Sequence, residues 1–410
     1  MKITRASRAA PYFQSRTSGA VLQFCGVRGC HSGNSLCENH SLHAQSRFRL
    51  LVVRLGAMGD ILHALPAVTA LRQAHPSWQI GWMVEPRWAS LLKADVRGQG
   101  SGVSEPEAAR ENRRDPGMPV VDQLHFARTR EWKRRPFSGQ TRRGIAALRR
   151  EIRAAGYDAA LDLQGAIRSA IVTRLSGARR RIGESAPREW PAHWLFTERV
   201  VTTGAHVVEQ DVELAAAVAG DELAPVDPWL PVDREAEEWS DAWLAAAIPG
   251  SPLPVALIVP GAGWGAKRWP VERYAVVARG LAERGFRVLV NCGPGEEALA
   301  APIAAGGAAI PLSVTLPQLI AMMRRVRLCI GGDTGPLHLA SALGRMVVGI
   351  YGPTDPSRNG PFGARCRVLR SLESRRDHSR RAAPDPGLLT ISPEDVLRAA
   401  DELVNEECAR

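Results

Sequence analysis

The chain repeats an alternation of short apolar strands and helices, and this alternation restricts the fold more than any other sequence feature. In the C-terminal half the pattern predicts strands at 255–259, 287–292, 308–312, 326–330 and 346–351. Helices are expected between these strands, at 271–284, 296–305, 316–324 and 336–343. Strands that alternate with helices form a parallel sheet with helices on both faces. We therefore predict an α/β fold with a doubly wound, Rossmann-like sheet in this half.

The N-terminal half carries a second series of the same kind. Its predicted strands are 50–53, 80–84, 123–127, 157–163 and 181–183, and its main helices are 61–73, 144–155 and 207–219. Two Rossmann-like domains place the carboxyl ends of both sets of strands at one ligand site between them. The predicted architecture is two Rossmann-like domains whose parallel sheets face each other across a cleft.

Composition shifts give the expected domain boundaries. We assign 48–232 to the first domain, 233–254 to a helix and linker, 255–375 to the second domain, and 376–410 to a tail with a closing helix at 394–406. Residues 1–47 hold six basic residues and one acidic residue without a sustained apolar run, which predicts a disordered extension. Its possible zinc ligands lack the spacing of a tight Cys-x2-Cys knuckle, so we expect no metal site there: Cys25, Cys30, His31, Cys37, His40 and His43.

Charge and cysteine content narrow the class of partner and the compartment. The 410 residues carry a formal net charge of +11, which indicates an anionic partner such as nucleic acid, a membrane surface or a phosphorylated substrate. Seven scattered cysteines favour a reduced, cytoplasmic setting over a disulfide framework. No window approaches the ~18 unbroken apolar residues of a membrane span, so we expect a soluble body.

The stretch 328–359 has the pattern of an anion site. A buried strand ends at Gly331 and Gly332, and Asp333-Thr334-Gly335 then leads into a short helix that carries His338. Glycines let backbone N–H groups approach a ligand, and the first turn of a helix offers unpaired donors and a positive dipole end. This pattern predicts a phosphate or diphosphate cradle, and an ordinary capped turn between strand and helix is the alternative.

Three further motifs each allow two interpretations. Asp60 follows the first strand and is either a general base or the cap of the helix that begins near Ile61. The glycine-rich loop 261–268 carries Lys267, which suits a diphosphate, or it is a solvated loop. Glu296 and Glu297 open a helix, where acids favour the dipole, although one of them could accept hydrogen bonds from a ribose or a base.

A basic segment, 128–153, also has two interpretations. It carries ten basic and two acidic residues, with aromatic residues interleaved. It contains no recognisable motif for binding DNA or RNA, so a solvated helix face is the default. An acidic lipid or sugar is the more specific alternative.

Five motifs in order resemble those of the lipopolysaccharide heptosyltransferases. They are RLGAMGDILHALP at 54–66, DLQG at 162–165 followed by Arg168 and Ser169, KRWP at 267–270, DTGPLH at 333–338, and YGPTDP at 351–356. The similarity covers roughly 48–407 apart from a loop near 97–120. The pattern is most similar to type I enzymes, although the motifs alone leave types II and III open.

The resemblance implies a GT-B fold and a specific reaction. A heptose would pass with inversion, and without a metal or cofactor, from ADP-L-glycero-D-manno-heptose to the Kdo (3-deoxy-octulosonate) of the lipopolysaccharide inner core. Asp60 would be the general base. The donor would be held by the second domain, with the diphosphate near Lys267 and His338 and the backbone of Thr334 and Gly335. Heptose hydroxyls would meet Asp333.

The remaining assignments also follow from the resemblance. Glu297 would meet the ribose of the donor, and Val314 would line the adenine pocket. The first domain would bind a Kdo-lipid A type acceptor through Arg134, Arg135 and Arg168. The protein is expected to be cytoplasmic and peripheral at the inner membrane, with no nucleic-acid partner. A two-domain NAD(P)-dependent oxidoreductase and a non-catalytic anion-binding protein are the competing hypotheses.

Overall fold

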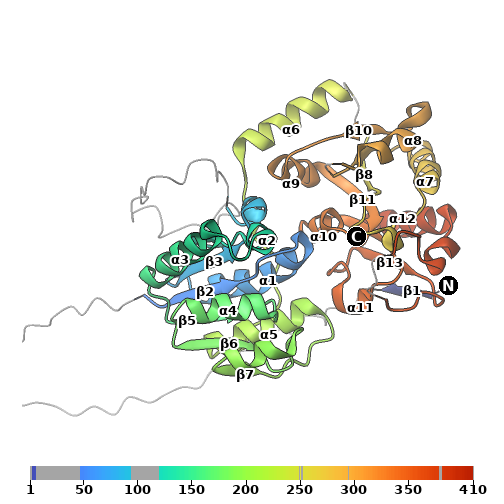
Figure 1. The fold of residues 1–410 in the computed structure, drawn as a ribbon. Helices are drawn as coiled ribbons and strands as arrows, with labels where there is room; N and C mark the ends of the chain where they lie inside the picture. Colours follow the sequence, from blue (N-terminus) through green and yellow to red (C-terminus); the bar gives the residue numbers. More distant parts are fainter. Residues whose placement is uncertain are drawn as a thin grey trace, which may run out of the picture.

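The computed structural model describes residues 2–5, 47–93, 120–248, 250, 253–293, 295–377 and 381–409. These residues form two α/β domains that lie side by side, one blue to green and the other yellow to red (Figure 1). The architecture predicted from the sequence, two Rossmann-like domains with parallel sheets, is confirmed. The cysteines and histidines weighed as zinc ligands in the N-terminal extension lie outside the described residues.

The N-terminal domain contains a six-stranded parallel sheet in the order β4-β3-β2-β5-β6-β7. Its strands are β2 (Arg49–Val53), β3 (Gln79–Val84), β4 (Gln123–Phe126), β5 (Ala159–Asp162), β6 (Arg180–Glu184) and β7 (Glu198–Val200). Its helices are α1 (Met58–Ala74), α2 (Thr129–Arg134), α3 (Gly139–Ala154), α4 (Ile167–Leu175) and α5 (Val207–Ala219).

Helices cover both faces of this sheet, which explains why its strands are apolar throughout. On β2, Leu50 and Val52 pack in the core on the side of α1 and α5, whereas Leu51 and Val53 pack on the side of α3 and α4. All four residues are completely buried. A strand buried on both faces is a continuous apolar run without polar alternation.

The C-terminal domain contains a seven-stranded sheet in the order β1-β13-β12-β11-β8-β9-β10. Its strands are β8 (Val255–Val259), β9 (Arg287–Asn291), β10 (Ile310–Leu312), β11 (Val326–Gly332), β12 (Met346–Tyr351) and β13 (Cys366–Arg370), with β1 (Lys2–Arg5) antiparallel at one edge. Its helices are α7 (Val271–Glu283), α8 (Ala300–Ala304), α9 (Leu316–Arg325), α10 (Gly335–Ala342), α11 (Pro356–Asn359) and α12 (Pro393–Cys408).

The two domains share one apolar core. The cluster that begins with α1 at Met58 and Ile61 continues through α10 at Leu337 and Leu339. Helix α1 packs directly against α10, so these two helices form the junction between the domains. The first turns of α1 and α10 therefore meet where the carboxyl ends of both sheets converge.

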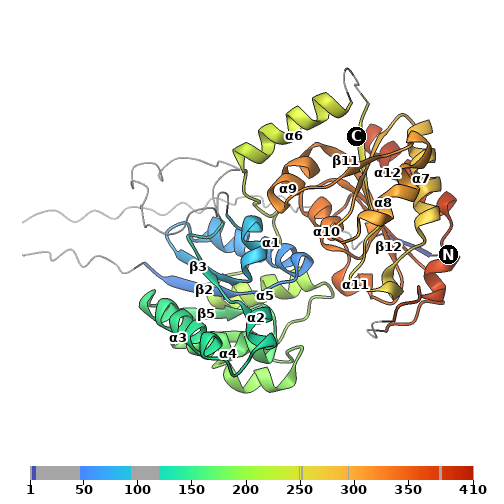
Figure 2. The same cartoon turned by 45° about the horizontal axis from the view of Figure 1, so that its top comes forward.

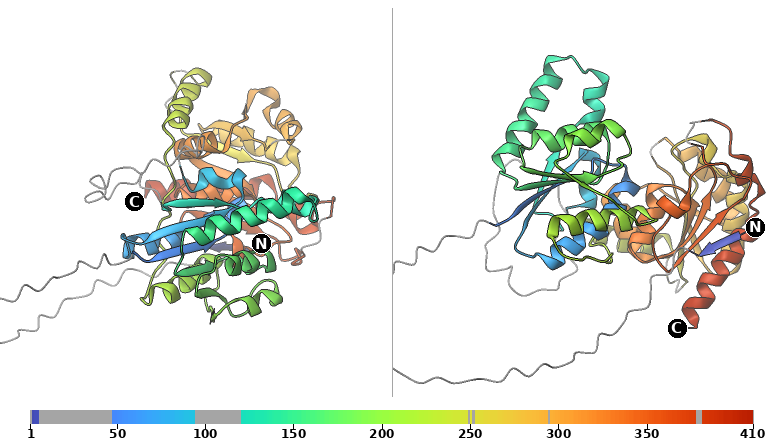
Figure 3. Two further views of the ribbon diagram at one scale, coloured as in Figure 1. Left: turned by 60° about the vertical axis from the view of Figure 1, so that its left-hand side comes forward. Right: turned by 90° about the horizontal axis from the view of Figure 1, so that it is seen from below.

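The linker helix and the closing helix both pack on the C-terminal domain. The linker helix α6 (Arg234–Ala247) lies on α9 (Figure 2), where Glu237 pairs with both Arg324 and Arg325 and Asp241 pairs with Arg325 at 2.6 Å. The closing helix α12 packs on α7, β12 and β13, at the far side from the N-terminal domain (Figure 3). No helix in the described ranges has the length and apolar content needed to cross a bilayer.

The structure differs from the sequence predictions at several places. Helix α1 begins at Met58 instead of Ile61. The helix predicted at 296–305 is a 3-10 turn at Glu297–Leu299 followed by the short helix α8, which ends at Ala304 because Ala305 has a ψ of 135°. Residues 2–5 form strand β1 and are thus not part of a disordered extension, whereas 6–46 and the predicted loop near 97–120 (of which 94–119) lie outside the described residues.

Candidate active site

The site lies where the N-termini of α1 and α10 meet. A Cβ atom added at Gly335 would lie 2.6 Å from Sδ of Met58, and one added at Gly59 would lie 2.8 Å from Cδ2 of His338. Both helices direct the positive end of their dipole towards this contact. Carboxylates from each domain, Asp60 and Asp333, flank it. An anion between the two helix ends would relieve the repulsion between like dipole ends.

Asp60 has two interactions and remains accessible. Its Oδ2 accepts a hydrogen bond from the Ala57 N–H at 2.8 Å, and Arg54 Nη2 lies 3.5 Å from its Oδ1. The carboxylate therefore does cap the backbone, but from the third position of α1. Its side chain is 35% exposed, so Oδ1 can still meet a substrate hydroxyl. The capping and general-base interpretations are compatible in this geometry.

The motif at 162–165 supports the loop that carries Asp60. The buried Gln164 side chain accepts a hydrogen bond from the Leu55 N–H at 2.9 Å. Asp162 Oδ1 in turn accepts from the N–H groups of Gln164 and Gly165 and from the Ser169 hydroxyl. Burial raises the pKa of Asp162 to about 6 although these hydrogen bonds favour the anion. The motif at 162–165 thus has a structural role, which is to hold the loop before α1 in place.

A second buried carboxylate lies near Asp60. Burial raises the pKa of Asp211 on α5 to about 7, the Arg54 guanidinium opposes that rise, and the negative charges of Asp60 and Glu184 add to it. Asp211 Oδ2 has no hydrogen-bond partner among the described residues. Arg54 therefore offsets the charge of two carboxylates, which explains why a cation is buried at the end of β2.

Across the junction, Lys267, Asp333 and His338 form one group. The Lys267 ammonium donates to Asp333 Oδ2 and lies 4.1 Å from the centre of the Trp264 ring. His338 Nε2 donates to Asp333 Oδ1 at 3.2 Å. Burial alone would raise the pKa of Asp333, but the His338 hydrogen bond and the Lys267 charge hold that pKa well below its ordinary range. The three residues predicted to bind the donor are thus brought together.

The structure separates the two neighbouring glutamates. A Cβ atom added at Gly261 would lie 2.1 Å from Glu296 Oε2, so Glu296 contacts the glycine-rich loop, and it also lies 3.7 Å from Arg268. Glu297 is exposed and accepts the Gly295 N–H at 3.0 Å. Of the two glutamates, it is Glu296 whose carboxylate contacts the glycine-rich loop, whereas Glu297, the residue predicted to meet the ribose, bonds to the Gly295 N–H.

The other predicted residues have less direct roles. Val314 is half-buried beyond the end of β10. Thr334 is the N-cap residue of α10, but its hydroxyl donates to the Gly332 carbonyl at 3.3 Å and makes no capping hydrogen bond to the helix. Arg134, Arg135 and Arg168 are exposed on α2, just after it, and on α4. These arginines follow β4 and β5, at the same sheet edge as Asp60. Among the described residues, no ion pair orients these three arginines.

Sequence reasoning assigned no role to several residues at the junction. Arg54 and His63 lie within the quoted motif, and His63 is one helical turn after Asp60, which is a signal that both face the cleft. His206 and Gly360 carried no such signal, because they meet only in the folded chain. The described residues hold no cluster of three or more histidine, cysteine or acidic side chains arranged for a metal ion.

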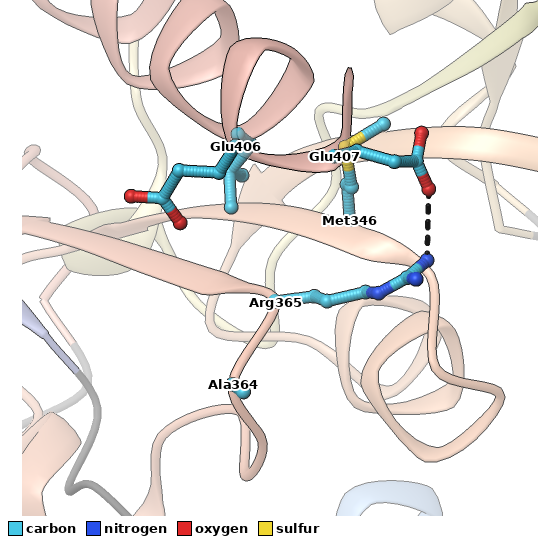
Figure 4. Close-up of a pocket in the computed structure, with 6 residues that line it drawn as sticks. Met346, Ala364, Arg365, Glu406 and Glu407 are labelled. Carbon is cyan, nitrogen blue, oxygen red and sulfur yellow. Dashed lines mark hydrogen bonds and ion pairs between the residues drawn. The ribbon is translucent and has the colours of Figure 1, made fainter. Parts of the chain in front are cut away.

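A separate small hollow lies at the opposite end of the C-terminal sheet (Figure 4). It is lined by Met346, Ala364, Arg365, Leu403, Glu406 and Glu407. Arg365 pairs with Glu407 across it at 2.9 Å. Because Met346 is the first residue of β12, this hollow lies at the amino ends of the strands. Ligands of doubly wound sheets bind at the carboxyl ends, so the hollow is not the expected substrate site.

The fold and the site together are those of a two-domain glycosyltransferase of the GT-B type. The profile of glycosyltransferase family 9 (heptosyltransferase) matches residues 145–385, and the chain belongs to this family.

Similar proteins agree with this assignment. Lipopolysaccharide heptosyltransferase 1 of Escherichia coli K12 is 28% identical over 362 residues, which are 87% of this chain and 100% of that protein. The protein of the same name from Pseudomonas aeruginosa is 29% identical over 325 residues, 77% of this chain and 81% of its own. The structure of the E. coli heptosyltransferase WaaC with ADP superposes with a TM-score of 0.67 at 25% identity, covering 87% of this chain and 100% of that one.

Proposed function

We propose that this enzyme transfers a heptose from ADP-L-glycero-D-manno-heptose to a Kdo residue of the lipopolysaccharide inner core, with inversion at the anomeric carbon. The observation that carries the proposal is the placement of Asp60 on α1 opposite the Lys267–Asp333–His338 group at the start of α10. Similar proteins support the choice of donor, since WaaC structures contain ADP and ADP-2-deoxy-2-fluoro heptose. The names of the related enzymes support the acceptor class.

The C-terminal domain would hold the donor. Lys267 would leave Asp333 and meet the diphosphate, and the backbone N–H groups of Thr334 and Gly335 would receive phosphate oxygens at the positive end of α10. Asp333, released from the ammonium, could then accept heptose hydroxyls while His338 keeps its orientation. Val314 would line the adenine pocket. In this exchange Lys267 gains the diphosphate as its ionic partner, and the Asp333 carboxylate keeps the His338 N–H and gains hydroxyl donors, so neither buried group is left without a polar partner.

We assign the ribose to Glu296 in place of Glu297. Glu296 faces the glycine-rich loop that also carries Lys267, and Arg268 lies within 3.7 Å of it. A carboxylate beside this loop can accept both hydroxyl groups of a ribose whose diphosphate lies at Lys267. The Glu297 carboxylate instead accepts a hydrogen bond from the Gly295 N–H.

The N-terminal domain would bind the acceptor and remove its proton. Asp60 Oδ1 would accept the proton of the attacking Kdo hydroxyl as the new glycosidic bond forms and the bond to the departing ADP breaks. Arg54, 3.5 Å from that carboxylate, would orient it. Arg134, Arg135 and Arg168 would meet the phosphates and carboxylates of a Kdo-lipid A type acceptor. The enzyme would then work on the cytoplasmic side of the inner membrane as a peripheral protein, without a cofactor.

The replacement Asp60→Asn tests the base assignment. The amide keeps the acceptor atom for the Ala57 N–H but cannot take a proton, so transfer should fall by about 10²–10⁴-fold. ADP binding, measured by calorimetry, should remain unchanged. Asp221→Asn serves as the matched control, because Asp221 follows α5 and contacts His75 at the C-terminal end of α1. Near-normal turnover by the Asp60 variant would refute the assignment.

Calorimetric titration of the unmodified enzyme with ADP, UDP and NAD tests the reaction class. ADP should bind most tightly. Preference for NAD would favour the oxidoreductase hypothesis, and binding of DNA without ADP affinity would favour an anion-binding protein.

A further inference from the structure

Three histidines from both domains meet behind the candidate active site. The His63 ring of α1 packs edge-on against the His338 ring of α10, with ring centres 4.5 Å apart. On its other side His63 meets His206, which precedes α5, with ring centres 5.3 Å apart. All three side chains are buried. Aromatic contacts of this geometry hold rings in fixed relative orientations.

Two of these histidines share one backbone acceptor in the opposite domain. His63 Nε2 lies 3.2 Å and His206 Nε2 lies 3.0 Å from the Gly360 carbonyl oxygen. His206 Nδ1 accepts the Val208 N–H, so its proton is on Nε2, and this nitrogen donates to Gly360. A carbonyl oxygen has two lone pairs and can accept from both rings. Two histidines of the N-terminal domain thus contact one backbone carbonyl of the C-terminal domain.

This contact is continuous with both halves of the site. His63 lies one turn after Asp60 on the same face of α1. His338, which packs on His63, donates to Asp333. Gly360 ends α11, and beside it Arg358 Nη2 reaches Gln210 Oε1 of the N-terminal domain at 3.3 Å. A movement that separates Gly360 from the two histidines would therefore also move α10 away from α1.

We propose that His63 and His206 are positioning residues that hold the cleft closed by donating together to the Gly360 carbonyl, which fixes the separation of Asp60 from the donor group at Asp333. The proposal rests on the proposed role of Asp60. It assigns a function in the reaction to side chains that lie behind the reacting atoms.

A pH dependence follows from the surroundings of the two rings. Burial lowers the pKa of His63 well below its usual value, with His338, His206 and Arg54 lowering it further and Asp333 opposing. Burial also lowers the pKa of His206 to about 4, where the Gly360 hydrogen bond and Glu209 oppose and His338 and Arg358 add to the decrease. When the domains separate, both rings regain contact with water and an ordinary pKa near 6.5. The open form binds more protons, so closure should weaken as the pH falls below ~6.5.

Alanine and glutamine replacements of each histidine separate the hydrogen bond from the charge. The glutamine Nε2 group can still donate to Gly360 but cannot take a proton, whereas alanine removes the donor. His193→Gln and His193→Ala are matched controls, because His193 bonds to the Ser185 carbonyl within one domain at 2.9 Å. For each full-length variant we would measure the radius of gyration by small-angle X-ray scattering, the ADP affinity, and kcat between pH 5.5 and 8.

The alanine variants should have a larger radius of gyration and a kcat roughly five- to tenfold lower, as expected for one lost hydrogen bond. ADP affinity should change less than about twofold, because the donor contacts lie in the other domain. The glutamine variants should restore both quantities at pH 7.5 and lose less activity than the unmodified enzyme at pH 5.5.

An unchanged radius with a normal kcat in His63→Ala and His206→Ala would overturn the proposal. So would a loss that glutamine does not rescue, since that outcome would indicate a packing role alone. Failure of the Asp60 assignment is distinguishable, because Asp60→Asn would then retain turnover while the histidine variants still change the radius of gyration.

Discussion

At the residue scale, the charged side chains of the candidate donor site pair with one another. The Lys267 ammonium contacts Asp333 on one side and the Trp264 ring on the other. Both ions are mostly buried, with side-chain exposures of 11% and 14%. A buried ion that loses its partner is destabilising by several kcal/mol, so each must remain paired until a ligand replaces the partner. The diphosphate of the donor would be such a ligand for Lys267.

The two neighbouring glutamates give a test at this scale. Glu296→Gln should weaken ADP binding by about 1–2 kcal/mol, because a neutral amide accepts weaker hydrogen bonds from ribose hydroxyls than a carboxylate does. Glu297→Gln, one residue away and exposed, should leave ADP affinity unchanged. Calorimetry with ADP measures both variants. Equal effects at the two positions would contradict the assignment of the ribose to Glu296.

The sequence predicted the loops of the site better than its individual contacts. Asp333 was expected in the turn before a short helix that carries His338, and the structure brings the two side chains together. The choice between Glu296 and Glu297 depends on a 3-10 turn that begins at Glu297, and a pattern of charges does not determine such a turn. The partners of Gly360 are 154 and 297 residues away in the chain, so no local signal predicts them.

At the scale of elements, Asp162 joins β5 to the loop before α4. Its Oδ1 accepts from Gln164, Gly165 and Ser169, and Gln164 then holds Leu55 of the loop before α1. One carboxylate thus fixes the carboxyl ends of two neighbouring strands. The position of Asp60 depends on this arrangement, although Asp162 itself lies below the cleft surface and is 1% exposed.

Replacement of Asp162 should affect stability in two different ways. Asp162→Ala removes the shared acceptor and should lower the free energy of unfolding by about 2–4 kcal/mol. Asp162→Asn keeps an acceptor oxygen and should cost less. Because burial raises the folded-state pKa to about 6, the folded protein binds a proton before the unfolded one as the pH falls. This group therefore adds stability at low pH that is lost as the pH rises through about 6.

The measurement is urea unfolding of the unmodified protein and both variants between pH 5 and 8. The asparagine variant should show a flatter pH dependence than the unmodified protein. A parallel dependence in the two proteins would contradict the expectation that Asp162 titrates in this range.

Elements were predictable where the hydrophobic pattern alone decides them. Strands β8 and β12 have the bounds predicted from the sequence, because both are short apolar runs that end in glycine- or proline-containing loops. Strand β13 was not predicted, since its sequence mixes Arg367 and Arg370 with apolar residues. Arg367 is nevertheless buried, because Glu402 and Glu406 of α12 pair with it. Such tertiary pairing has no local sequence signal.

At the scale of the molecule, positive charge is concentrated on one side of the N-terminal domain. The segment 128–153 holds ten basic and two acidic residues and forms α2 and α3, which project from that domain (Figure 3). Phe137, between the two helices, is 85% exposed. A basic surface with an exposed aromatic residue suits the interface of an anionic bilayer, where the proposed lipid acceptor is found.

Binding to vesicles tests this surface. The unmodified enzyme should bind vesicles that contain anionic lipid, and binding should weaken as salt is raised. The double replacement Arg142→Glu and Arg149→Glu should reduce the affinity at least tenfold, since each basic residue near such a surface contributes about 1 kcal/mol. The double replacement Arg279→Glu and Arg398→Glu, exposed on α7 and α12 of the other domain, is the charge-matched control. Sedimentation with the vesicles measures the bound fraction, and equal losses in both proteins would point to net charge as the cause.

The contact between α1 and α10 has a consequence for engineering. Gly59 faces His338 and Gly335 faces Met58, and neither position has room for a Cβ atom without a shift of its neighbour. Because these two residues have no side chain, α1 and α10 can approach each other more closely here than they could with any other residue at either position. Side chains of increasing size at either position would wedge the cleft open by graded amounts. Gly59 is not among the groups proposed to contact the substrates, so replacements at this position offer a graded adjustment of the transfer rate.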